Sequence, residues 1–261
     1  MKIGVVGLGL IGGSIFKALN DSYDVVGISC SQNNKLKNIV NDLNLLKDCD
    51  VVFVATPMNK TLDVLDKLDK VLNKDTIVAD VCSLKEFLSK KEYRFNFIPT
   101  HPMAGTEKKG FENSFKELFE GAKWVICKKE IECPKKLKIL IEQMGAKIVY
   151  TSPKEHDEAV AIISHAPMVL SQALFKLAEQ NELALKLASS GFRDMTRLAI
   201  TNDEMASDMV NMNYQNIQNA ILKFYTSVGD LLKSDYRQQV SVIRESRSKM
   251  YDKNGKNVLE H

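Results

Sequence analysis

Short apolar runs alternate with apolar residues at helical spacing over the first half of the chain. Continuous apolar runs are typical of parallel strands covered on both faces, and they predict strands at Lys2–Gly7, Asp24–Ile28, Val51–Ala55, Thr76–Asp80 and Asn96–Pro99. Helical spacing between these runs predicts helices at Leu10–Asn20, Lys35–Leu43, Lys60–Leu72 and Leu84–Lys91. This alternation predicts an α/β fold with a doubly wound parallel sheet and right-handed crossovers.

The pattern changes near residue 150. Lys123–Cys127 and Lys147–Tyr150 are candidates to extend the sheet, and beyond Thr151 helical segments dominate as far as Lys249. No Pro- or Gly-rich linker separates the two parts. We therefore expect a sheet domain over residues 1–152 and an all-helical domain over residues 153–258, packed directly against each other. Residues 259–261 look like a vector-derived tail.

Apolar positions in the helical part exceed what one face against the sheet domain would bury. A set at helical spacing comprises Ile217, Ile221, Phe224, Tyr225, Val228 and Leu231. We expect this surface to form a homodimer through the helical domain. The alternative is that all six residues belong to the core of a single chain.

Composition and charge narrow the function classes. Of the 261 residues 44% are hydrophobic and 26% charged, with a formal net charge of +3, which is typical of a globular protein and argues against nucleic-acid binding. No apolar run approaches the roughly 18–20 residues of a membrane span, and no secretory signal is recognisable, so we expect a cytoplasmic protein. The five cysteines lack metal-ligand spacing, so no metal site is expected.

A glycine-rich turn follows the first predicted strand and opens the first helix. Gly7-Leu8-Gly9-Leu10-Ile11-Gly12 has the spacing of a dinucleotide-binding turn of Rossmann type. Gly7 permits the tight turn, Gly9 lets the backbone approach a pyrophosphate, and Gly12 allows close helix–strand packing. With Leu10 and Ile11 at the helix start, these glycines predict binding of NAD or NADP.

The second predicted strand ends without the acid that usually contacts the adenosine ribose of NAD. Ser29 and Ser31 occupy this region, and either hydroxyl is able to bond a ribose hydroxyl or a phosphate. No arginine follows to pair with a 2′-phosphate, although Lys35 is near. The preference between NAD and NADP therefore stays open.

The candidate catalytic segment is Thr100–Glu107, directly after the fifth predicted strand. Open α/β sheets bind substrates at the carboxyl ends of their strands. A histidine there, His101, is suited to accept a hydroxyl proton while hydride leaves. Taken alone, a histidine at such a place is more often structural than catalytic.

Five segments together resemble the prephenate and arogenate dehydrogenases, the family that makes the tyrosine precursor. In chain order they are GLGLIGGS from Gly7, DVCSLK from Asp80, HPMAGTE from His101, SHAP from Ser164 and GFRDMTR from Gly191. The resemblance implies a Rossmann domain followed by a helical dimerisation domain. It also implies NAD(P)-dependent oxidative decarboxylation of prephenate to 4-hydroxyphenylpyruvate in tyrosine biosynthesis, with arogenate as a possible second substrate.

The same resemblance implies roles for individual residues. His101 takes the hydroxyl proton, Ser83 hydrogen-bonds the substrate hydroxyl and the histidine, and Arg197 holds a substrate carboxylate. The remaining matched positions are Arg193, Thr106, Glu107 and His165. Arg193 adds positive charge, Thr106 and Glu107 match site positions, and His165 either lines the pocket or is a hydrogen-bonded core histidine.

One position departs from the family pattern. Many prephenate-specific members carry a second histidine where this chain has Met168, so the choice between prephenate and arogenate stays open. His156 matches no motif and is expected at the surface. Two alternatives remain: another Rossmann-plus-helical dehydrogenase or reductase, and a nucleotide-sensing protein without catalysis.

Overall fold

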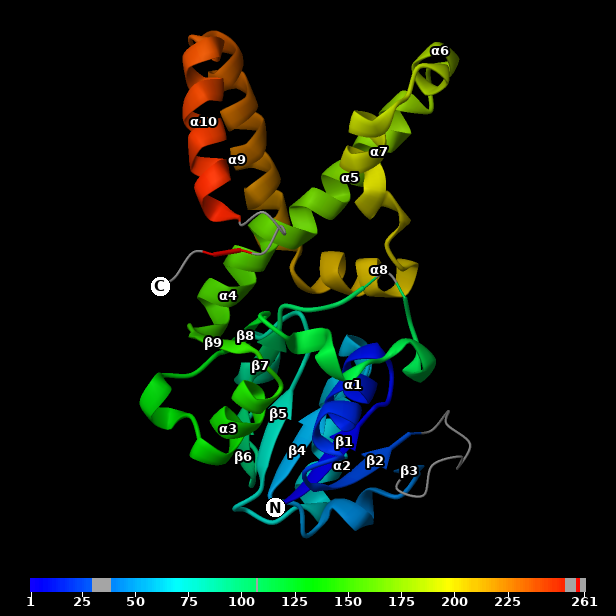
Figure 1. Ribbon diagram of the computed structural model, residues 1–261, viewed down its shortest axis with the longest axis vertical. Coiled ribbons are helices and arrows are strands. Elements are labelled where there is room, and N and C mark those ends of the chain that lie inside the picture. The colour runs from blue at the N-terminus through cyan, green and yellow to red at the C-terminus, as the bar shows by residue number, and fades with distance from the viewer. Residues whose placement is uncertain (30–38, 107, 252–256, 259–261) are drawn as a thin grey trace.

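The computed structural model describes residues 1–29, 39–106, 108–251 and 257–258. An α/β domain is followed by a helical domain (Figure 1). The strands are β1 (Lys2–Val6), β2 (Asp24–Ile28), β3 (Ile39–Val40), β4 (Val51–Val54), β5 (Ile77–Asp80), β6 (Asn96–Ile98), β7 (Thr100–Pro102), β8 (Lys123–Ile126) and β9 (Lys147–Tyr150). The α-helices are α1 (Leu10–Leu19), α2 (Met58–Val71), α3 (Lys135–Gln143), α4 (Pro153–Val160), α5 (Ala166–Ala178), α6 (Glu182–Lys186), α7 (Ser190–Thr196), α8 (Asp203–Met212), α9 (Tyr214–Lys233) and α10 (Tyr236–Met250).

The main sheet confirms the predicted fold class. Its six strands are all parallel, in the order β3-β2-β1-β4-β5-β6, and the order reverses between β1 and β4, which is where dinucleotides bind in such sheets. The four residues of β4 are fully buried. Val51 and Phe53 belong to one apolar cluster and Val52 and Val54 to the other, so both faces of the strand are covered.

The prediction that Lys123–Cys127 and Lys147–Tyr150 extend this sheet is wrong. They form β8 and β9 of a separate three-stranded sheet, in which β7 pairs antiparallel with β8. Pro99 lies between β6 and β7 and has no N–H to continue the ladder, although its carbonyl oxygen accepts from Cys127 N at 2.9 Å. The chain therefore leaves the main sheet at Pro99, and His101 lies within β7 of the second sheet.

Two predicted helices are also corrected. Of Leu84–Lys91 only Leu88–Lys90 is helical, as a short 3-10 turn. The backbone N–H groups of Lys85 and Glu86 in the preceding turn are bound by the Asp157 carboxylate. Lys35–Leu43 does not end as predicted, because its last residue, Leu43, starts a separate 3-10 helix, Leu43–Leu46. Ile39–Val40 pairs with β2, while residues 30–38 lie outside the described part of the chain.

A buried ion pair holds the end of β5 to the start of β7. Lys85 Nζ contacts the Asp80 carboxylate, with both side chains fully buried, and also donates to the Thr100 carbonyl oxygen at 2.6 Å. Burial raises the pKa of Asp80, and Lys85 opposes this shift. The pair therefore fixes the connection between the two sheets at the edge where His101 begins its strand.

Replacing Lys85 by methionine should lower the free energy of unfolding by about 3–5 kcal/mol, because it leaves the Asp80 carboxyl buried without its partner. Urea unfolding followed by circular dichroism measures this. The matched control is Lys91→Met, whose pair with Asp66 is half exposed and should cost less than about 1 kcal/mol. Equal losses in the two variants would contradict a structural role for the buried pair.

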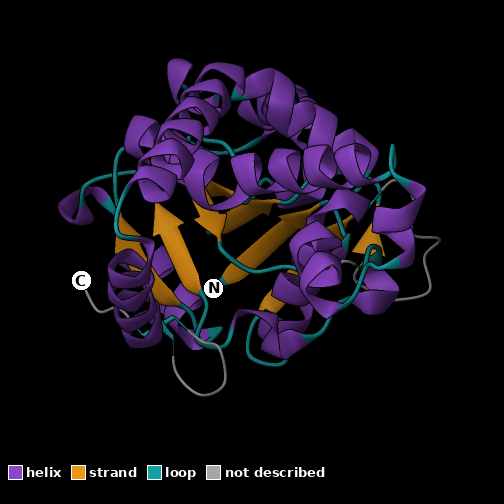
Figure 2. Ribbon diagram, turned by 90° about the horizontal axis from the view of Figure 1, so that it is seen from above, coloured by secondary structure: helices purple, strands orange, loops and turns teal. Residues whose placement is uncertain are grey.

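The helical domain starts with one continuous helix, Pro153–Ala178. Its middle turn, Ala161–His165, is π-helical. Pro167 follows at the start of α5 and supplies no N–H to the helical ladder, a defect that a widened turn accommodates. Beyond it the helices separate into two arms, the α9–α10 hairpin and the α5–α6–α7 segment, which both point away from the sheets (Figure 1). Seen from above, helices lie on both sides of the strands (Figure 2).

The continuous helix is apolar over a longer stretch than the sequence suggested. By length and mean hydropathy (1.4) alone it would be able to cross a membrane, and a third of the apolar stretch is buried within the chain. Scattered polar residues such as Ser164 and His165 hide this stretch from a search for uninterrupted apolar runs. Ile162 and Ile163 are among its exposed residues.

Candidate active site

The glycine-rich turn joins β1 to α1 at the carboxyl edge of the main sheet. Gly7 has a positive φ of 89°, and a Cβ there would lie 2.6 Å from the Ala55 carbonyl oxygen. A Cβ on Gly12 would lie 1.9 Å from the carbonyl oxygen of Gly7. Both positions therefore need glycine, since no side chain fits between α1 and the strand ends.

The start of α1 is suited to receive a phosphate. A Cβ added to Gly9 would meet nothing within 4 Å, and because Gly9 is the N-cap residue, no side chain caps the helix start. Leu10 and Ile11 form the half-buried first turn, which carries no acidic side chain. The helix dipole and backbone N–H groups thus face open space, as a pyrophosphate requires.

Ser29 lies at the end of β2, beside the glycine turn. It is buried, and its backbone N donates to the Val40 carbonyl oxygen at 3.0 Å. Ser31 lies outside the described residues. Because β2 pairs with β1, Ser29 lies next to the strand that leads into the glycine turn. One of the two candidate ribose contacts is thus near the expected cofactor site.

A pocket of about 240 Å³ lies between the two domains. Its walls come from the turn after β5, from β7 and the loop that follows it, and from the helical domain; they comprise Ser83, His101, Pro102, Met103, Ala104, Gly105, Val160, Ser164, His165 and Met209. Since β1, β4 and β5 are parallel neighbours, the glycine turn and Ser83 are separated by two strand spacings, roughly 10 Å. A nicotinamide nucleotide is long enough to extend from the turn to this pocket.

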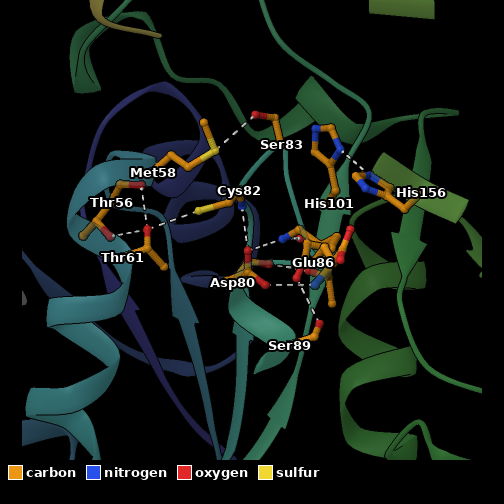
Figure 3. Close-up of polar contacts among 12 residues, drawn as sticks. Thr56, Met58, Thr61, Asp80, Cys82, Ser83, Glu86, Ser89, His101 and His156 are labelled. Carbon is orange, nitrogen blue, oxygen red and sulfur yellow. Dashed lines mark hydrogen bonds and ion pairs between the residues drawn. The ribbon is translucent and has the colours of Figure 1, made fainter. Parts of the chain in front are cut away.

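His101 lies in this pocket with one ring nitrogen engaged. Its Nδ1 is 2.9 Å from Nε2 of His156, and the second nitrogen lies on the side of Ser83 (Figure 3). Burial, together with nearby His156, Lys85 and His165, lowers the pKa of His101 well below its ordinary value. The imidazole is therefore neutral at pH 7 and ready to accept a proton.

His156 is not at the surface, as its lack of a motif had suggested. It is 3% exposed on α4, and its Nδ1 is 2.7 Å from Oδ1 of Asp157. The capping box of Ser152 and Glu155 starts α4 at Pro153, which turns this part of the helix toward the end of β7. His156 and Asp157 thereby become part of the candidate site.

Ser83 faces the same pocket but makes a different contact from the one implied by the resemblance. Its Oγ donates to the sulfur of Met58 at 3.8 Å, and it is not bonded to His101 (Figure 3). The surrounding turn is fixed from both sides, because Cys82 N donates to Asp80 and Lys85 N donates to Asp157. Rotation of the hydroxyl, without backbone movement, is enough to turn it toward a substrate.

His165 combines the two roles that the sequence left open. It lines the pocket, and it is 1% exposed with Nδ1 3.2 Å from Nδ2 of Asn213. Burial lowers the pKa of His165 to about 4, so the ring is neutral. Met168, one turn later, is buried and is not part of the pocket wall.

The remaining candidates are not brought to the pocket. Thr106 is exposed, and its Oγ1 accepts from Lys108 N at 3.2 Å, while Glu107 lies outside the described residues. Arg193 and Arg197 are exposed at α7 and the turn after it, on the arm that points away from β7 (Figure 1). Arg193 pairs with Asp194 at 3.3 Å, and Arg197 has no ion-pair partner within the described ranges.

Comparison with known proteins adds a family assignment to this geometry. The nucleotide-binding domain model of prephenate dehydrogenase matches residues 24–150, and its dimerization domain model matches residues 152–241. Prephenate dehydrogenase of Bacillus subtilis is 30% identical over 240 residues, which is 82% of this chain and 64% of that protein. This chain thus spans slightly less than two thirds of that relative.

Two solved structures are similar over almost their whole length. Arogenate dehydrogenase of Synechocystis has a TM-score of 0.79 and 32% identity, covering 96% of this chain and 97% of that one. Prephenate dehydrogenase of Aquifex aeolicus, in complex with hydroxyphenyl propionate and NAD+, has a TM-score of 0.81 and 26% identity, covering 95% and 96%.

Proposed function

The chain belongs to the prephenate dehydrogenase family, and we propose that it oxidatively decarboxylates prephenate, with arogenate as a second substrate, using NAD or NADP. The observation that carries this proposal is the place of His101, a neutral base in a pocket at the carboxyl edge of a dinucleotide-binding sheet. The structural relative with NAD+ also holds hydroxyphenyl propionate, an aromatic acid related to the proposed product.

The cofactor would be held by Gly7, Gly9 and Gly12 with the first turn of α1, and Ser29 would contact its adenosine ribose. When bound, the nicotinamide supplies the acceptor for the hydride that leaves the ring carbon bearing the hydroxyl. The residues of the chain fit this group because the glycine turn keeps open space in front of the helix N-terminus.

His101 accepts the proton of the ring hydroxyl as that carbon is oxidised to a carbonyl. The ring carboxylate then departs as CO2, its bonding electrons enter the ring, and the product becomes an aromatic phenol. Aromatisation drives this second step, so the chain's own task is to position the substrate and to stabilise charge. Ser83 would donate to the developing oxygen, and Arg197 would hold a carboxylate through its two-pronged guanidinium.

The test is cofactor reduction followed at the nicotinamide absorbance, with prephenate and arogenate offered separately. Formation of 4-hydroxyphenylpyruvate from prephenate, or tyrosine from arogenate, would support the proposal. Tight binding of cofactor without turnover of either substrate would favour the nucleotide-sensing alternative. Turnover of only an unrelated hydroxy acid would favour another dehydrogenase with a Rossmann and a helical domain.

We expect this assay to show relaxed selectivity for both the cofactor and the substrate. Ser29 brings no negative charge against a 2′-phosphate, so NADP should be accepted. Position 168 carries no histidine to bond the keto acid side chain of prephenate, and Met168 itself lies outside the pocket wall, so arogenate should not be strongly excluded. Steady-state kcat/KM values for the four combinations measure this. Strict NAD use with a preference for prephenate above about 10⁴-fold would mean that other residues set both choices.

We further infer a homodimer through the helical domain. Phe224 and Tyr225 on α9 and Leu187 on the other arm are 50%, 78% and 73% exposed, so the apolar set noted in the sequence is not all intrachain core. The family's name for residues 152–241 is a dimerization domain. A second copy of the chain is therefore the occupant we expect for the exposed apolar faces of the two arms.

Light scattering at micromolar concentration should give twice the chain mass of 29.3 kDa. Tyr225→Glu places a charge in the expected interface and should shift the mass toward the monomer, because an unpaired charge is costly to bury. Lys67→Glu on α2, an exposed position of the sheet domain outside both arms, is the control for altered surface charge. A wild-type monomer under these conditions would contradict the dimer.

A further inference from the structure

The hydrogen bonds of His101 continue beyond the pocket through two residues for which the sequence offered no role. We propose that His156 and Asp157 are positioning residues that hold His101 with its Nδ1 protonated and its Nε2 bare, so that Nε2 is the base. The effect of this arrangement on turnover rests on the proposed function. The positions of the protons on the two rings do not depend on it.

The argument starts at the Asp157 carboxylate, which is 4% exposed. Its Oδ1 accepts from Lys85 N and its Oδ2 from Glu86 N, both at 2.9 Å. Backbone N–H groups are donors only, so both oxygens of the Asp157 carboxylate act as acceptors in these two bonds. The proton in the 2.7 Å contact between Asp157 and His156 therefore belongs to Nδ1 of His156.

The next contact follows from the first. A neutral histidine that is protonated on Nδ1 has a bare Nε2, which accepts only. Because Nε2 of His156 lies 2.9 Å from Nδ1 of His101, the proton between the two rings belongs to His101. One carboxylate thus determines the tautomers of both rings, and Nε2 of His101 keeps its lone pair on the side of Ser83 (Figure 3).

This arrangement also offsets a cost of catalysis. Proton uptake turns a buried ring into an imidazolium, and burial opposes that charge. The Nδ1–H of the imidazolium donates to His156, which is polarised in turn by the Asp157 carboxylate. A base whose other nitrogen is oriented through a buried carboxylate follows the logic of catalytic triads, with one imidazole inserted between base and acid.

The first test is spectroscopic and uses the free protein. Two-bond ¹⁵N–¹H correlation spectra of the four histidines at pH 7.5, assigned with His101→Asn and His156→Leu, should give both His101 and His156 as Nδ1–H tautomers. Free imidazole side chains favour the Nε2–H form, so this pattern would not arise by default. A proton on Nε2 of either residue would overturn the proposal.

The second test is kinetic. His156→Leu should lower kcat by about 10–10³-fold and leave KM within about threefold. This loss lies between that caused by removing an outer hydrogen-bond partner and that caused by holding a base in the wrong tautomer. In the same spectra this variant should shift His101 toward the Nε2–H form. His156→Gln offers an amide oxygen to His101 and should recover at least about tenfold of the lost kcat, since a charge-assisted bond is regained.

Thr76→Val is the control for loss of a buried hydrogen bond, since Thr76 is 3% exposed and donates to Cys49 O at the other end of β5. It should lower the unfolding temperature and leave kcat unchanged.

Equal kcat losses in His156→Leu and His156→Gln, with the His101 tautomer unmoved, would reduce His156 to a packing role. The spectra need neither substrate nor cofactor, so they test the tautomer assignment independently of the proposed function. If the protein shows both Nδ1–H tautomers but oxidises neither prephenate nor arogenate, the proposed function is refuted and the tautomer assignment stands.

Discussion

Replacing His101 by asparagine should lower kcat by about 10²–10⁴-fold, the usual size of the loss when a general base is removed. Asparagine keeps a polar group of similar length but does not accept a proton. The imidazole of the native chain is able to do so, because burial and its neighbours hold its pKa below the ordinary value and so leave the ring neutral at pH 7, with a lone pair for the substrate proton. Stopped-flow reduction of the cofactor isolates the chemical step from product release.

The affinity for cofactor is the internal control in this variant. The glycine turn that would hold the pyrophosphate belongs to β1 and α1, whereas His101 belongs to β7. Cofactor binding, measured by nicotinamide fluorescence, should therefore stay within about twofold of the native value, well below 1 kcal/mol. If the variant keeps most of its turnover, His101 has no part in the proton transfer and the base must be sought elsewhere in the pocket.

The main sheet was predictable because its signals are local. Strands β1, β2, β4, β5 and β6 lie in apolar runs, and the spacing of Gly7, Gly9 and Gly12 identifies the first strand–helix junction. The two-residue strand β3 was missed, because Ile39–Val40 lay within a predicted helix. The pairing of β7 with β8 was not predictable in this way. A buried run such as Lys123–Cys127 reads the same in either sheet, and only the position of Pro99 and the long-range contact of Cys127 with it decide the partner.

The site was half predictable for a related reason. His101, Ser83 and His165 lie in segments with a family pattern, and all three line one pocket. His156 was missed because a polar residue in a charged segment, between Glu155 and Asp157, indicates a solvated helix face. A signal was present: Val160, one turn later at i+4, is apolar and 2% exposed, and residues at this spacing share a helix face.

Loss of Arg197 should raise KM for prephenate by roughly 30–1000-fold, or about 2–4 kcal/mol, with a smaller effect on kcat, because a charge-assisted pair in a partly desolvated site is removed. Lys186→Ala, which removes another exposed cation on the same arm, should leave KM within about twofold. Unchanged KM with weakened NAD binding in Arg197→Ala would assign the arginine to the cofactor instead.

Arg197 must reach its substrate from the other subunit if this prediction is right. Its arm points away from the pocket of its own chain (Figure 1), and the pocket wall contains residues of α8 and the continuous helix but neither Arg193 nor Arg197. A twofold dimer exchanges equivalent surfaces, so the arm of one subunit would complete the pocket of its partner. The site would then combine His101 of one copy with Arg197 of the other.

Mixed dimers decide between the two arrangements. A heterodimer of one His101→Asn and one Arg197→Ala subunit, purified with two different affinity tags, has one pocket with both residues intact if Arg197 acts across the interface. Its activity at low prephenate should then be about half that of the native dimer, as expected for one working site of two related by symmetry. If Arg197 served its own subunit, each pocket would lack one residue, and the heterodimer would be no more active than the mean of its two parents.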